Sequence, residues 1–223
     1  MNRITFQTLL TRALRYPVCD HAVFRQLVLQ FPPAHSTDGE AVQELSVTLE
    51  APRRLFRFLS SSEAVAPQNI SHDPLPFLTQ LPHLHETLPP SFTNAFSLVI
   101  DLDVNSNEGY ALVRSVHAEA YPLIQFLLGH GARPGLKRGL AVIIAVRKKN
   151  LDLVKMLIEK DFVPPQLQPK RRSGKKRRKL DDRCEVTQEM LKIAVKSKAK
   201  DIVTYFTQVK GCIPDMETLQ IMF

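Results

Sequence analysis

The sequence predicts an all-α protein, a solenoid of stacked helical pairs, and an internal repeat is the main reason. Residues 110–134, 140–164 and 190–214 can be laid over one another, each as two short apolar-faced helices that end on proline. The first two stretches keep a constant offset of 30 residues, so Leu127 recurs as Leu157. A period of this size is typical of repeat arrays, in which stacked neighbours supply the core that one repeat lacks.

Length and composition agree with one sizeable core. The chain has 223 residues, 44% of them hydrophobic, which is enough for a core that needs no disulfide bonds. Three widely spaced cysteines, Cys19, Cys184 and Cys212, indicate reduced thiols in a cytosolic or nuclear protein. Because no run of about 18 apolar residues occurs, the sequence predicts no membrane-spanning helix and no membrane partner. Residues 1–19 carry arginines and no acid, as mitochondrial presequences do, but we favour a first amphipathic helix there.

Residues 1–60 predict two helical pairs. Residues 6–15 and 22–31 are both apolar-striped, and Pro17 between them suits a break between two helices. The second predicted pair consists of residues 40–50 and 53–59.

Residues 61–91 predict a loop that packs on the array. Their six prolines forbid long helices, while their leucines and Phe77 make the segment too apolar for a free linker. Residues 91–102 then predict one more helix, although residues 96–102 alone could form a buried strand.

Residues 92–164 and 185–223 predict regular repeats. The helix expected in residues 150–160 has Lys155 and Glu159 on one side and a buried apolar stripe on the other. This stripe consists of Leu151, Val154, Leu157 and Ile158. The small Ala145 and Ala194 stand where two helices are expected to approach closely.

Residues 140–164 resemble the second half of an ankyrin repeat. They carry a small pair, Ala145-Val146, and then Asn-Leu-Asp-Leu-Val-Lys-Met-Leu in residues 150–157. Residues 131–134 keep the family's loop almost intact as Gly-Ala-Arg-Pro. The family's Thr-Pro-Leu-His is absent, so the repeats are degenerate.

The resemblance implies a single ankyrin-like helical-repeat solenoid over residues 1–223, with shortened or irregular fingers. Gly109 and Gly139 stand where the family places the glycine that precedes its first helix. Residues 134–139 are short for the family's β-turn finger, so we expect the fingers to be reduced. The concave side, lined by fingers and first helices, is the implied partner surface. Its candidate residues are Arg133, Lys137, Arg138, Arg147 and Lys148.

A basic segment, residues 170–179, accounts for the net charge of +8. It holds 8 of the 30 basic residues and no acid, which leaves 22 basic and 22 acidic residues elsewhere. Because like charges so close together oppose packing, we expect residues 165–184 to be a disordered insert between two repeats. The basic side chains are Lys170, Arg171, Arg172, Lys175, Lys176, Arg177, Arg178 and Lys179.

Three roles are open for the basic segment. Its two clusters, separated by Ser173 and Gly174, fit the usual description of a nuclear import signal read by an acidic receptor groove. The same cations could bind phosphate backbones through counterion release. Two observations stand against nucleic acid as the main function: the rest of the chain is neutral and predicts no basic helix face, and no aromatic residues stand among the cations. A merely solvated charge run is the third interpretation.

Recognisable catalytic motifs are absent, which predicts a non-enzymatic protein without cofactor or metal. His83, His85 and Glu86 are too few for a convincing zinc site without nearby cysteine. Asp101 and Asp103 lack the glycine and glutamate spacing of a calcium loop and fit a turn instead.

The sequence therefore predicts a protein–protein interaction module that acts in the nucleus, with some protein in the cytoplasm. Its expected partners are a protein of unknown identity and a nuclear import receptor. The alternative is a nucleic-acid- or chromatin-associated protein anchored by the basic segment.

Overall fold

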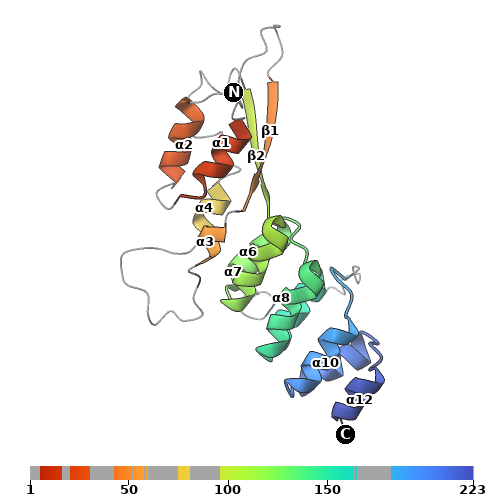
Figure 1. The fold of residues 1–223 in the computed structure, drawn as a ribbon. Helices are drawn as coiled ribbons and strands as arrows, with labels where there is room; N and C mark the ends of the chain where they lie inside the picture. The colour runs from red at the N-terminus through yellow and green to blue at the C-terminus, as the bar shows by residue number, and fades with distance from the viewer. Residues whose placement is uncertain are drawn as a thin grey trace.

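The computed structural model describes residues 6–16, 21–30, 43–51, 53–57, 59, 75–80, 96–162, 164 and 182–222. Within this part of the chain helices predominate, as the sequence predicts. The same residues also form one two-stranded sheet. Figure 1 shows two regions: helices beside the sheet near the N-terminus, and a descending series of helical pairs that leads to the C-terminus.

The N-terminal helices form the predicted hairpin. Helices α1 (Phe6–Ala13) and α2 (His21–Gln30) contact each other, and Leu10 and Phe24 are fully buried. The ring of Phe24 meets Phe77 of α4 (Leu75–Gln80) edge to face, with ring centroids 6.4 Å apart. Helix α4 is the described part of residues 61–91, and its Leu78 is buried.

Two strands replace two predicted helices. Strand β1 (Gln43–Glu50) pairs in parallel with β2 (Phe96–Asp103), in a register that places Val47 opposite Ile100. The helices predicted for residues 40–50 and 91–102 are therefore wrong, whereas the strand given as the alternative for residues 96–102 is present as β2. Val47 and Leu49 are buried while Thr48 and Glu50 are exposed, the two-residue alternation of a strand with one covered face. Residues after β1 do form a helix, α3 (Arg53–Arg57).

Polar contacts join the sheet and α3 to the helical pairs. The backbone N–H of Ala51 donates to the hydroxyl of Ser106 at 2.9 Å. The guanidinium of Arg114 donates to the carbonyl oxygens of Phe56, Arg57 and Leu59, at 3.3, 2.8 and 3.2 Å. These carbonyls lie at the end of α3, where a helix leaves acceptors unsatisfied, so Arg114 caps that helix from outside.

Stacked helical pairs make up the rest of the described chain. The first pair is α6 (Ser106–His117) with α7 (Tyr121–Gly129), and the second is α8 (Leu136–Arg147) with α9 (Leu151–Ile158). The third pair is α10 (Gln188–Lys196) with α11 (Lys200–Thr204), which continues as a π-helix, η4 (Tyr205–Val209), before α12 (Met216–Met222). Helix α8 contacts both α6 and α10, and α10 contacts α12, so the first helices stack in sequence order.

The three turns between paired helices share one backbone conformation. Glu119, Lys149 and Lys198 are left-handed, with φ of 55°, 56° and 54°. In each turn, the backbone N–H of the next residue donates to the carbonyl oxygen of the residue five positions earlier. The N–O distances are 3.1 Å in the first turn, 3.2 Å in the second and 3.0 Å in the third. The sequence offset of 30 residues is thus a structural repeat, and an offset of 49 relates the third turn to the second.

The first helices α6 and α8 open with a left-handed turn that ends on glycine. Its residues are Asn107, Glu108 and Gly109 in α6, and Lys137, Arg138 and Gly139 in α8. A β-carbon on Gly109 would lie 3.3 Å from Leu136, and one on Gly139 would overlap the terminal methyl of Met190. Each glycine therefore leaves room for a side chain of the following repeat.

The predicted core of the array is buried. Leu127, Val154, Leu157 and Ile158 are inaccessible to solvent, and so are Ala145 and Ala194 at the close approaches between helices. Leu151 is half-buried. None of the described helices is long and apolar enough to cross a membrane.

Candidate interaction surfaces

The basic segment, residues 170–179, lies outside the described residues, but the structure describes Pro164 before it and the chain from Asp182 after it. Pro164 is buried on the N-terminal side. On the C-terminal side, the chain is described again from Asp182, directly beside the end of α9.

A cluster of polar side chains binds the chain at Asp182 to the end of α9 and to η4. The ammonium group of Lys210 lies 2.8 Å from Asp182 Oδ1 and 3.2 Å from Glu159 Oε1, and its side chain is only 6% exposed. The hydroxyl of Tyr205 donates to Glu159 Oε1 at 2.8 Å. Burial alone would lower the pKa of Lys210, but hydrogen bonds to Asp182 and Glu159 raise it above its ordinary value. The charged Lys210 therefore links its own stretch of chain to two others, at Glu159 and at Asp182.

Arg183 completes this cluster by capping α9. Its backbone N–H donates to the carbonyl of Ile158 at 2.6 Å, and its guanidinium donates to the carbonyls of Met156, Glu159 and Lys160. A cation at the C-terminal end of a helix also complements the helix dipole. We call Glu159, Asp182, Arg183, Tyr205 and Lys210 the return anchor.

The return anchor changes two expectations. The predicted insert extends to residue 184, yet the chain already rejoins the array at Asp182. Lys155 and Glu159 do not face open solvent: Glu159 belongs to the anchor, and the Lys155 ammonium lies 5.7 Å from the ring centroids of both Phe162 and Tyr205. Sequence patterns could not reveal the anchor, because its members come from three stretches that only the fold brings together.

Deleting residues 170–179 is expected to leave thermal unfolding almost unchanged. A segment that contributes no buried area should change stability by less than about 0.5 kcal/mol, a shift of roughly 2 °C at most. Differential scanning calorimetry of the deletion variant and the full chain measures this. A loss of about 5 °C or more would mean that the segment packs on the array.

The predicted cationic partner surface divides into two groups. Arg133, Lys137 and Arg138 lie before and at the start of α8, whereas Arg147 and Lys148 lie at its other end, about 14 Å away by helical rise. Lys137 pairs with Glu108 at 3.0 Å, and Lys148 pairs with Glu119 at 2.8 Å. The structure therefore does not bring the five side chains into a single cluster.

Asp101 does not lie in the turn that the sequence predicts, because it belongs to strand β2, whereas Asp103 ends that strand and begins a turn. The carboxylate of Asp101 accepts the N–H of Leu102 at 2.8 Å, and that of Asp103 accepts the N–H of Asn105 at 3.0 Å. The side-chain amide of Asn105 donates to the carbonyl of Gly131 and accepts the N–H of Arg133, in the loop that leads from α7 to α8.

No group of three or more potential metal ligands occurs among the residues that the structure describes. His83, His85 and Glu86 lie outside those residues. Burial raises the pKa of the Cys184 thiol to about 11, so this thiol is a poor nucleophile near neutral pH.

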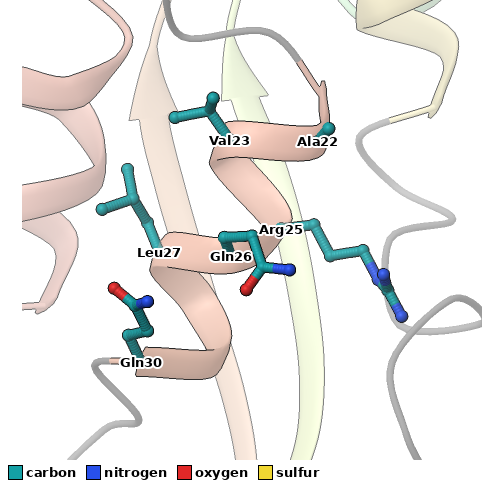
Figure 2. A pocket seen from close by; sticks show the side chains of 6 residues that line it. All are labelled: Ala22, Val23, Arg25, Gln26, Leu27 and Gln30. Atoms are coloured by element: carbon teal, nitrogen blue, oxygen red, sulfur yellow. The ribbon is translucent and has the colours of Figure 1, made fainter.

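A shallow pocket of about 320 Å³ lies on the surface of α2. Figure 2 shows its lining side chains, which all come from this one helix: Ala22, Val23, Arg25, Gln26, Leu27 and Gln30. Val23 and Leu27 give the pocket an apolar part, but its lining brings together no pair of groups suited to catalysis.

The chain was compared with known proteins at three levels. No protein-family model, no curated protein and no solved structure matches it.

Proposed function

We propose that the helical pairs are degenerate ankyrin-like repeats and that the protein is a non-enzymatic protein–protein interaction module of the nucleus. One observation supports this most: the repeats continue on both sides of a strongly basic segment, and the return anchor joins them there. The basic segment is thus an addition to an array whose packing is continuous through α8 and α10.

The ankyrin-like assignment is supported by the repeated backbone. Turns of the same conformation follow α6, α8 and α10, and Gly109 and Gly139 both adopt φ of 73° before a first helix. Solenoids of this kind present extended surfaces built from equivalent positions of successive repeats, which suits the binding of protein partners.

Nuclear import through the basic segment is supported by its composition and by its place in the chain. Eight cations without an acid match the electrostatics of an acidic receptor groove. The segment lies in the sequence between the buried Pro164 and Asp182, which rejoins the third repeat to the end of α9. We therefore expect a receptor to read it without unfolding the repeats.

Replacing Lys175, Lys176, Arg177 and Arg178 by alanine is expected to move a tagged protein from the nucleus to the cytoplasm, because the receptor groove loses half of its cationic partners. Fluorescence imaging of cells measures the distribution. A matched control removes four other exposed cations, Arg12, Arg53, Arg57 and Lys160, and should remain nuclear.

Unchanged nuclear accumulation of the first variant would contradict the import role and leave the segment either a nucleic-acid role or no role. The interaction module is tested separately, by capture of partners from nuclear extract with the full chain and with a chain lacking residues 170–179. The same protein partners should bind both, because the array is intact in each.

A further inference from the structure

Stacking of the repeats gathers a row of cations that are far apart in the sequence. Residues 147–152 and 196–201 form the turns after α8 and α10, and together they contain six basic and two acidic side chains. The shared turn conformation aligns Arg147 with Lys196, Lys149 with Lys198, and residue 151 with Lys200. Helices α8 and α10 contact each other, as do α9 and α11, so the two turns are neighbours (Figure 1).

Five of these cations point into solvent. Arg147, Lys149, Lys196, Lys198 and Lys200 are exposed, and none of them forms an ion pair with another residue that the structure describes. The sixth, Lys148, is half-buried against Glu119. Packed helices lie about 8 to 10 Å apart, so the five charges share one continuous edge. We call these five residues the basic turn edge.

Stability does not account for this charge. Cations in the last turn of a helix complement its dipole, which explains Arg147 in α8 and Lys196 in α10. Lys200 begins α11, where the dipole disfavours a positive charge. Lys149 and Lys198 have φ of 56° and 54°, a conformation that favours glycine or asparagine over lysine. Three of the five cations therefore stand where folding alone would select other residues.

The chemistry of the edge favours one class of partner. Large exposed hydrophobic side chains occur elsewhere among the described residues, and none lies in residues 147–152 or 196–201. Protein interfaces draw most of their binding energy from buried aromatic and apolar anchors. Phosphate backbones need no such anchors, because lysine and arginine bind them by releasing condensed counterions.

We propose that the basic turn edge binds the phosphate backbone of nucleic acid, without reading bases. This role goes beyond the proposed function, since it uses none of the residues of the basic segment.

Duplex DNA of about 20 base pairs, labelled with a fluorophore, is a suitable probe for the full-length protein, with affinity measured at several salt concentrations by fluorescence anisotropy. The edge variant carries Lys149→Asn, Lys198→Asn and Lys200→Gln, with asparagine chosen because it tolerates the left-handed turn. Its log–log salt slope should fall by about 2 to 3, because each lost phosphate contact contributes about 0.9. Affinity at about 0.1 M salt should fall at least about 10-fold.

A control variant removes the same charge from other exposed sites, through Arg133→Gln, Arg138→Asn and Lys160→Gln. Its slope should change by less than about 1. A second edge variant, with arginine at positions 149, 198 and 200, should keep the original slope, which separates lost charge from a disturbed turn. The proposal is overturned if the edge and control variants lose equal slope, or if the edge variant loses none. It is also overturned if the edge variant stops binding polyglutamate or anionic phospholipid vesicles while its DNA binding is unchanged.

Discussion

Replacing Leu157 by alanine is expected to lower the free energy of unfolding by about 2 to 5 kcal/mol. The side chain is fully buried in α9, between α8 and the third helical pair, so truncation leaves a cavity that rigid neighbours cannot fill. Leu127 is the equivalent residue of α7, is also inaccessible to solvent, and should show a loss in the same range. Urea denaturation followed by circular dichroism measures both values.

Two further alanine variants make this prediction specific. Gln125 is exposed on α7, so Gln125→Ala should change the free energy of unfolding by less than about 0.5 kcal/mol. Glu159→Ala should be costlier than an exposed substitution, because it leaves Lys210 and Tyr205 without a shared acceptor. A Gln125 variant as damaging as the Leu157 variant would mean that the buried faces of the helices are assigned wrongly.

Gly139→Ala is expected to lower the free energy of unfolding by about 2 kcal/mol. Alanine at φ of 73° costs about 1 kcal/mol in backbone strain. The new methyl group would also overlap the end of the Met190 side chain, which is 1% exposed and must repack among α8 and α10. Overpacking here adds about 1 kcal/mol, the low end of the usual range, because the atom met is the far end of a flexible methionine side chain.

Gly131→Ala separates the two contributions. Gly131 has φ of 81°, but a β-carbon there would meet open space, so only the backbone cost of about 1 kcal/mol applies. The difference between the two variants measures the contact between successive repeats. Equal losses in thermal or urea unfolding would show that Met190 does not pack against Gly139.

The array was the predictable part of the fold. Apolar stripes such as that of residues 150–160 are local patterns, and the offset of 30 residues repeats them in a fixed phase. Glycine at positions 109 and 139 marks backbone conformations that other residues adopt at a cost, so these positions were also visible in the sequence.

The sheet could not be predicted in the same way. Strands β1 and β2 pair across 53 residues, and a parallel pairing of such separation leaves no local signature beyond short apolar runs. Residues 47–50 alternate in burial, but the length and composition of residues 43–50 also suit one face of a helix. Pairing with residues 96–103 decides between the two.

The candidate surfaces depended on stacking for a similar reason. Glu159, Asp182 and Lys210 form an anchor only because the third repeat returns to the end of α9. The basic turn edge joins residues that are 49 positions apart, and it becomes visible once the turns are known to share one conformation.

Amide hydrogen exchange in the Leu157→Ala variant tests the stacked array most directly. In such an array each repeat is stabilised by its neighbours, so a defect in α9 should loosen the repeats on both sides. Exchange should accelerate in residues 124–128 of α7 and in residues 202–206 of α11 and η4, as well as in α9. Acceleration confined to residues 151–158 would show that the helical pairs do not support one another and would contradict the repeat register.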